Sequence, residues 1–190
     1  MRTLIYIFLA LYSISLVSCK KEKNTNIKVE ASAENKKSLK KIAVATIDSK
    51  SNTETSGTIT FTEIDQKVTM IAQLDNISNS GPHAIHIHAI GDCNSEDGKS
   101  AGGHWNPTNT NHGKWNSETF HIGDIGNIQI NEKGNGTISR TTDLWCINCE
   151  DDKKNIIGKA IIIHKGPDDF TSQPSGAAGP RIGCGEIITQ

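Results

Sequence analysis

The sequence predicts an all-β domain of about eight short strands joined by polar turns, with two long loops. Gly accounts for 17 of the 190 residues, and Thr, Ser and Asn are also plentiful, which is typical of a fold with many turns. Aromatic residues make up only 5% of the chain and hydrophobic residues 35%, a poor match to a helical bundle or a coiled coil. No segment of the body shows the hydrophobic period of a helix of useful length.

The individual strands are identified by the alternation of apolar and polar residues. Residues 68–74 show it best, because every second side chain is apolar and Ile71 is the one exception among the intervening positions. Comparable runs, with Gly, Asn, Asp or Lys at most of the breaks, occupy 42–47, 56–64, 83–90, 126–131, 136–142, 158–165 and 182–188. Two connections, 91–125 and 166–181, are long, and long ordered loops on a β body usually carry function.

The N-terminus predicts export. A short apolar run, 4–17, follows Arg2 and is too short for a comfortable transmembrane helix, so residues 1–18 match a signal peptide. The run ends Leu-Val-Ser-Cys, which resembles a bacterial lipobox and predicts that Cys19 is lipidated. The alternative is an ordinary cleaved signal peptide followed by a chance cysteine.

The charge distribution separates an arm from a body. Residues 19–41 contain eight Lys and three Glu, a net charge of +5, and have little to bury, so they predict a flexible basic tether. Residues 42–190 contain eleven Lys and Arg against eighteen Asp and Glu, a net charge of −7, and predict one folded domain without internal repeats. The whole chain has a net charge of −1, so no basic field favours nucleic acid as a partner.

All seven histidines lie in the body, and their spacing indicates metal binding. His86 and His88 project from one face of a strand and can hold one copper or zinc ion, although two partly exposed histidines would show the same spacing. Three imidazoles and one carboxylate follow in the first long loop, a tetrahedral zinc set with no open position: His104, His112, His121 and Asp124. His164, at the end of a later strand, is a third candidate ligand for the copper pair.

These histidines stand in segments that together resemble the Cu/Zn superoxide dismutases. The matching segments are 81–93 (GPHAIHIHAIGDC), 101–107 (AGGHWNP), 112–113 (HG), 121–127 (HIGDIGN), 156–160 (IIGKA) and 179–185 (GPRIGCG). They occur in the family's order, and the resemblance runs from about residue 42 to the C-terminus. It implies an eight-stranded antiparallel Greek-key β-barrel or sandwich.

The resemblance also implies the roles of particular residues. His86, His88, His104 and His164 resemble the copper ligands, and His104, His112, His121 and Asp124 resemble the zinc ligands, so His104 would bridge the two metals. His83 resembles a structural histidine. Asp168 resembles the carboxylate that links a copper histidine to a zinc histidine. Cys93 and Cys184 resemble the family's disulfide.

The implied activity is the dismutation of superoxide to dioxygen and hydrogen peroxide by one copper ion bridged to one structural zinc ion. The catalytic residues would be His104, which also carries a proton, and Arg181, which attracts the anionic substrate. An alternative role for Arg181 is to bind carbonyl groups near Cys93. With lipid on Cys19, the enzyme would protect a bacterial cell envelope, and Lys20 favours the outer membrane, facing the periplasm or the surface. A homodimer is one open alternative.

Two other classes of function remain as alternatives. The same barrel could sequester or pass on copper without fast turnover, or serve as a structural adhesin, although an adhesin leaves seven histidines unexplained.

Two features depart from the family's usual pattern: Ala84-Ile85 precedes the copper pair, and the loop 166–180 has few charges. A third feature, Cys146 and Cys149, predicts a local disulfide in an exported chain. A redox-active pair, an extra metal site, or pairing with Cys93 or Cys184 are the alternatives.

Overall fold

The structure is a computed structural model that describes residues 39–190. Within this part of the chain there are eight strands of five to nine residues, one strand of two residues and one short 3₁₀ helix. They are β1 (Lys41–Ser49), β2 (Ser56–Ile64), β3 (Lys67–Asp75), β4 (Gly81–His88), η1 (Lys99–Ala101), β5 (Asp124–Ile130), β6 (Gly136–Thr142), β7 (Ala160–His164), β8 (Arg181–Glu186) and β9 (Ile188–Thr189). The predicted all-β fold is confirmed.

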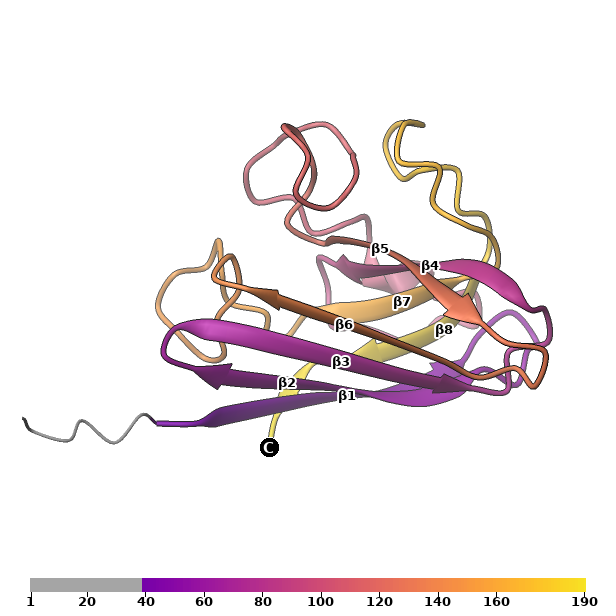
Figure 1. Ribbon diagram of the computed structural model, residues 1–190, viewed down its shortest axis with the longest axis horizontal. Helices are drawn as coiled ribbons and strands as arrows, with labels where there is room; N and C mark the ends of the chain where they lie inside the picture. The colour runs from indigo at the N-terminus through magenta and orange to yellow at the C-terminus, as the bar shows by residue number, and fades with distance from the viewer. Residues whose placement is uncertain (1–38) are drawn as a thin grey trace, which may run out of the picture. The chain divides into compact units, whose positions relative to one another are not determined.

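The eight long strands close into an antiparallel barrel (Figure 1). The strand order is β2-β3-β6-β5-β4-β7-β8-β1, and pairing of β1 with β2 closes the ring. The chain crosses from β3 to β4 and returns through β5 to β6, which pairs with β3, and this is a Greek-key connection. The short β9 pairs with the first half of β1, at Ala43 and Val44.

Two strands are buried on both faces, and this explains where the histidines lie. In β2 and β3 only alternate residues are buried, as expected for strands with one face in water. In β7 every residue is buried, and so are the last six residues of β4. Ile85 and Ile87 point into the main core, whereas His86 and His88 point to the opposite face, which the long loops cover.

The two predicted long loops are present and lie on the same side of the barrel (Figure 1). One connects β4 to β5 through residues 89–123, and the other connects β7 to β8 through residues 165–180. The strand predicted at 158–165 is shorter, because Gly158 has φ +74° in the turn before it. The strand predicted at 182–188 is interrupted after Glu186 and resumes as β9.

The described residues form two disulfide bonds. Cys93–Cys184 joins the first long loop to β8 across 91 sequence positions, with 5.7 Å between the Cα atoms. Cys146–Cys149 is local, so neither of its cysteines is joined to Cys93 or Cys184.

The predicted signal peptide, 1–18, the predicted lipidation site Cys19 and nearly all of the predicted tether, 19–41, lie outside the described residues. Among the described residues, no helix has the length and apolar character needed to cross a membrane.

Candidate metal centre

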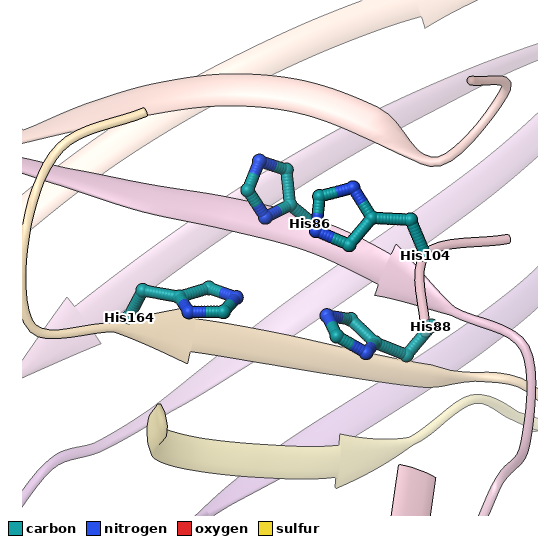
Figure 2. A group of neighbouring side chains, drawn as sticks. All are labelled: His86, His88, His104 and His164. Carbon is teal, nitrogen blue, oxygen red and sulfur yellow. The ribbon is translucent and has the colours of Figure 1, made fainter. Parts of the chain in front are cut away.

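Four histidines gather on the outer face of β4 and β7. β4 contributes His86 and His88, β7 ends with His164, and His104 reaches the group from the first long loop through a β-bridge to His88. Figure 2 shows the four rings around a common space beside these strands. One ring nitrogen of each histidine lies within 4.8 Å of the others, which is a spacing suited to one metal ion. We call this set the four-histidine cluster.

A second set of ligands shares His104 with the first. His104, His112, His121 and Asp124 also bring one ligand atom each within 4.8 Å of one another, and we call this set the aspartate cluster. The carboxylate of Asp124 lies at its centre. Its oxygens are 2.8 Å from His104 Nδ1, 3.0 Å from His112 Nδ1 and 3.2 Å from His121 Nδ1.

Six buried ring nitrogens in the two clusters make no well-directed hydrogen bond, although Nδ1 of His112 and Nδ1 of His121 lie 3.0 and 3.2 Å from the carboxylate of Asp124. They are His86 Nδ1, His88 Nε2, His104 Nε2, His112 Nδ1, His121 Nδ1 and His164 Nε2. Each such atom costs about 1–3 kcal/mol when it is buried without a partner. A metal ion in each cluster would satisfy these atoms, so the residues fit two metal sites. Three imidazoles with one carboxylate suit zinc, and four imidazoles suit copper.

The other nitrogen of each histidine faces a fixed acceptor, which sets its tautomer. His88 Nδ1 donates to the carbonyl oxygen of Gly102 at 2.9 Å, and His164 Nδ1 donates to that of Gly179 at 3.1 Å. His121 Nε2 donates to the carbonyl oxygen of Thr110 at 3.1 Å. Because these nitrogens carry the protons, the lone pairs of the opposite nitrogens point into the clusters before any metal arrives.

Asp168 connects the two clusters through the ring nitrogens of His86 and His112 that do not face the metal sites. Its carboxylate oxygens accept one hydrogen bond from His86 Nε2 at 2.8 Å and one from His112 Nε2 at 2.9 Å. Asn127 holds Asp168 in place through a reciprocal pair of bonds to its backbone N–H and C=O, at 2.7 and 2.9 Å. A Cβ at Gly176 would lie 2.7 Å from His112 Nε2, so only glycine fits behind this link.

The two clusters hold protons differently. Burial lowers the pKa of His104 to about 4 and that of His164 to about 3, and it also lowers the pKa of His88. Burial lowers the pKa of His112 as well, but the adjacent carboxylates of Asp124 and Asp168 outweigh it and raise that pKa to about 9. The same network holds the pKa of both carboxyls far below the usual range.

An open pocket of about 610 Å³ leads to the four-histidine cluster. It is lined by His88, His104, His164 and Arg181, and by Gln173 and other residues of the second long loop. The guanidinium of Arg181 donates to the carbonyl oxygens of Gly98 and Gly102 at 2.7 Å each. Arg181 therefore binds loop carbonyls near Cys93 and also presents its charge beside the pocket.

His83 lies outside both clusters. Its ring nitrogens are 2.9 Å from the carbonyl oxygen of His164 and 2.8 Å from that of Asn79, which is a structural position. Besides Asn127, two further supports of the site were not predicted from the sequence. Gln173 accepts the N–H of His112 at 2.9 Å and donates to its C=O at 3.0 Å. The indole N–H of Trp145 donates to the carbonyl oxygen of Ile122 at 3.0 Å, beside His121.

The comparisons with known proteins agree with this geometry. The family model for copper/zinc superoxide dismutase matches residues 55–187. Superoxide dismutases [Cu-Zn] 1 and 2 of Aquifex aeolicus are 40% and 42% identical over 60% and 55% of this chain, and the aligned parts span 69% and 62% of those proteins. The superoxide dismutase [Cu-Zn] of Humicola lutea is 36% identical over 78% of this chain and 97% of its own length. The chain has two candidate metal sites, with ligands suited to copper and zinc, on a Greek-key barrel. The family model matches most of the described residues. The chain therefore belongs to the copper/zinc superoxide dismutase family.

Proposed function

We propose that the chain catalyses the dismutation of superoxide to dioxygen and hydrogen peroxide, with copper in the four-histidine cluster and zinc in the aspartate cluster. The observation that carries the proposal is the set of six buried ring nitrogens that make no well-directed hydrogen bond and converge on two points. His104 belongs to both sets, since its Nε2 faces the four-histidine cluster and its Nδ1 faces Asp124. We infer that His104 bridges the two metals.

Bound copper would supply the one-electron chemistry of the reaction. The chain supplies the rest. Superoxide enters by the open pocket, where the charge of Arg181 attracts it. When His104 Nε2 is not ligated it would carry the ring proton, which faces the four-histidine cluster and can pass to the departing peroxide. Asp168 keeps the ring of His86 in one orientation throughout.

Attraction of the substrate has to be local. The predicted body, residues 42–190, has a net charge of −7 before metals bind, which repels an anion at long range. Among the described residues that line the pocket, Arg181 is the one Lys or Arg, and it is held in place by hydrogen bonds to two backbone carbonyl groups. We infer that Arg181 and the metal create a positive field inside the pocket that the surface charge does not cancel.

The first experiment is the dismutation rate per bound copper of the purified chain loaded with both metals. We expect a rate near the diffusion limit that disappears in His86→Ala, because this ligand and its hydrogen bond to Asp168 are both lost. Full copper loading with a rate no better than that of copper bound by buffer would contradict the enzyme and favour copper sequestration.

Proton counting tests the bridge separately. When copper is added to the zinc-loaded chain, bridging removes the last ring proton of His104 and releases about one proton per copper. When copper is added to the zinc-free chain, His104 Nδ1 keeps its proton on Asp124, so none is released from this residue. Equal proton release in the two titrations would contradict the bridge.

We also propose that the enzyme is a lipid-anchored protein of a bacterial cell envelope that removes superoxide outside the cytoplasm. The support is the sequence of residues 1–41, with its signal-like apolar run, the cysteine at its end and the charged tether. Incorporation of labelled fatty acid into the wild-type chain but not into Cys19→Ala, followed by membrane fractionation, tests the anchor. Sedimentation of the metal-loaded protein tests whether it is a homodimer.

A further inference from the structure

The connection between β6 and β7 holds a disulfide that the metal centre does not use. Cys146 and Cys149 lie in residues 143–159, the orange loop at the end of β6 in Figure 1, with 6.1 Å between their Cα atoms. The ring they close contains only four residues, so closing it removes little conformational entropy from the unfolded chain. Its contribution to the stability of the loop is therefore small.

Backbone hydrogen bonds hold the first cysteine without help from the disulfide. The N–H of Cys146 donates to the carbonyl oxygen of Lys154 at 2.8 Å, and the carbonyl oxygen of Cys146 accepts from Ile156 at 3.1 Å. Just before it, Trp145 is buried, packs against Phe61 and Trp115, and donates its indole N–H to Ile122.

The two residues between the cysteines are held as well. The N–H of Ile147 donates to the carboxylate of Glu63 at 2.6 Å, and its carbonyl oxygen accepts from the ammonium of Lys41 at 2.9 Å. The N–H of Asn148 donates to the side chain of Asn155 at 3.2 Å. None of these bonds involves the sulfur atoms, so we expect the loop to keep its conformation when the disulfide opens.

Access to the two sulfurs is unequal. Cys146 is 9% exposed, whereas Cys149 is more open, and both line a surface pocket of about 440 Å³. The pocket also contains three carboxylates and two ammonium groups: Glu63, Asp65, Asp143, Lys67 and Lys154. By contrast, Cys184 of the other disulfide is fully buried and packs in a small cluster with Ala101 and Ile162. Cys93, its partner, is half-buried like Cys149, so the two disulfides differ in their second cysteine and in the surface pocket that both Cys146 and Cys149 line.

The reduced state has a hydrogen-bond acceptor in place. Sγ of Cys149 lies 3.7 Å from the carbonyl oxygen of Asp151. In the disulfide this sulfur carries no hydrogen, but after reduction its thiol can donate to that oxygen. The loop is thus built to accommodate both the oxidised and the reduced pair.

We propose that Cys146–Cys149 is a redox-active pair that exchanges electrons with protein dithiols. A thiolate of the partner attacks Sγ of Cys149, the bond between Cys149 and Cys146 breaks, and Cys146 leaves as a thiolate that takes up a proton. The partner's second thiol loses its proton and attacks the partner sulfur of the mixed disulfide, which releases Cys149. Two electrons and two protons pass to this chain, and the partner becomes a disulfide.

The test compares the two disulfides of the metal-loaded chain. The chain is equilibrated with thioredoxin at graded ratios of reduced to oxidised form, and free thiols are trapped and mapped by mass spectrometry. We expect Cys146–Cys149 to open at a ratio at least about tenfold lower than Cys93–Cys184, with unchanged circular dichroism. The proposal would be overturned if both disulfides opened at the same ratio of reduced to oxidised thioredoxin, or if Cys93–Cys184 opened at the lower ratio.

Two matched variants identify the attacked sulfur. Cys146→Ser leaves the thiol of Cys149, and Cys149→Ser leaves that of Cys146. We expect the first variant to react with an aromatic disulfide at least about tenfold faster than the second, because Cys149 is the less buried residue. Equal rates would overturn the assignment of Cys149. The double variant should keep wild-type circular dichroism and dismutation, and its failure to fold would show a structural disulfide instead.

Discussion

The two metal clusters share a histidine but are built in different ways. In the four-histidine cluster, three of the four ligands lie on paired strands, where His86 pairs with Ile162 and His88 with Ala160. In the aspartate cluster, His112 and His121 lie in a loop, and only Asp124 begins a strand. Sheet register positions the first set, whereas side-chain clamps such as Gln173 on His112 position the second. The four-histidine cluster is therefore built mainly on the barrel, and the aspartate cluster is built mainly on the loop that covers it.

The largest expected effect comes from breaking the strand-built cluster alone. In His88→Ala, copper and activity are lost, and we expect the dismutation rate to fall on the order of 1,000-fold. Zinc binding should persist, because His88 contacts no member of the aspartate cluster except the shared His104. Metal analysis of the purified variant gives both numbers. Loss of zinc together with copper would mean that the two clusters do not form independently.

A smaller effect is expected at the residue that joins the clusters. In Asp168→Asn the amide offers one oxygen to two N–H donors, so one of its NH₂ hydrogens opposes the N–H of His86 or His112. We expect the affinity for both metals to fall about 10- to 100-fold. Competition with chelators measures each affinity, and Asp169→Asn is the matched control, since Asp169 bonds only its own loop. A change in one metal alone would show that the link is one-sided.

Substitution of Arg181 should leave metal binding in both clusters unchanged and should affect only the approach of superoxide to the pocket. Arg181→Ala removes the positive charge beside the pocket, and we expect the bimolecular rate to fall about tenfold with a flatter dependence on salt. Copper and zinc contents should stay at one each. Arg181→Lys keeps the charge but cannot make both carbonyl contacts, so it separates attraction from anchoring of the loop. An unchanged rate and salt slope in Arg181→Ala would exclude attraction.

The smallest effect is a difference in protons. In the metal-free chain His112, with a pKa of about 9, is charged near neutral pH, so zinc has to displace about one proton from it. Above that pKa the release disappears. His88, His104 and His164 have lowered pKa values and are already neutral there, so copper displaces no proton from an imidazolium of these three residues. Titration in weak buffer measures both. Because folding raises the pKa of His112, protonation of this residue stabilises the metal-free fold. We therefore expect the metal-free fold to lose stability as the pH rises from about 6.5 through 9.

The sequence was sufficient to predict the strands and the placement of His86 and His88 on one face of a strand, because alternation of apolar and polar residues is a periodic signal. It was less informative at strand ends. A turn at Gly158 shortens β7, and an irregularity in the β4–β5 pairing between Ile85 and His86 has no counterpart in composition. The roles of Asp168 and Arg181 came from resemblance to a family and not from periodicity.

The supports of the loop-built cluster could not be predicted at all. Asn127 clamps Asp168 across 41 positions, and Gln173 clamps His112 across 61. A side-chain amide that bonds a distant peptide leaves no spacing to detect, since its partner is any backbone group that the fold brings near. The same holds for Trp145 and Ile122. Such contacts depend on the finished topology and become visible only in three dimensions.

The disulfide between Cys93 and Cys184 has a further consequence for damage to the chain. A protease that cuts the first long loop between His104 and His112 produces two pieces, one with His86 and His88 and the other with His164. Because the bridge spans the cut, the pieces cannot diffuse apart, and reassembly remains an intramolecular event. The nicked protein should migrate as one species without reductant and as two with it. The covalent link thus makes recovery of the copper site independent of protein concentration.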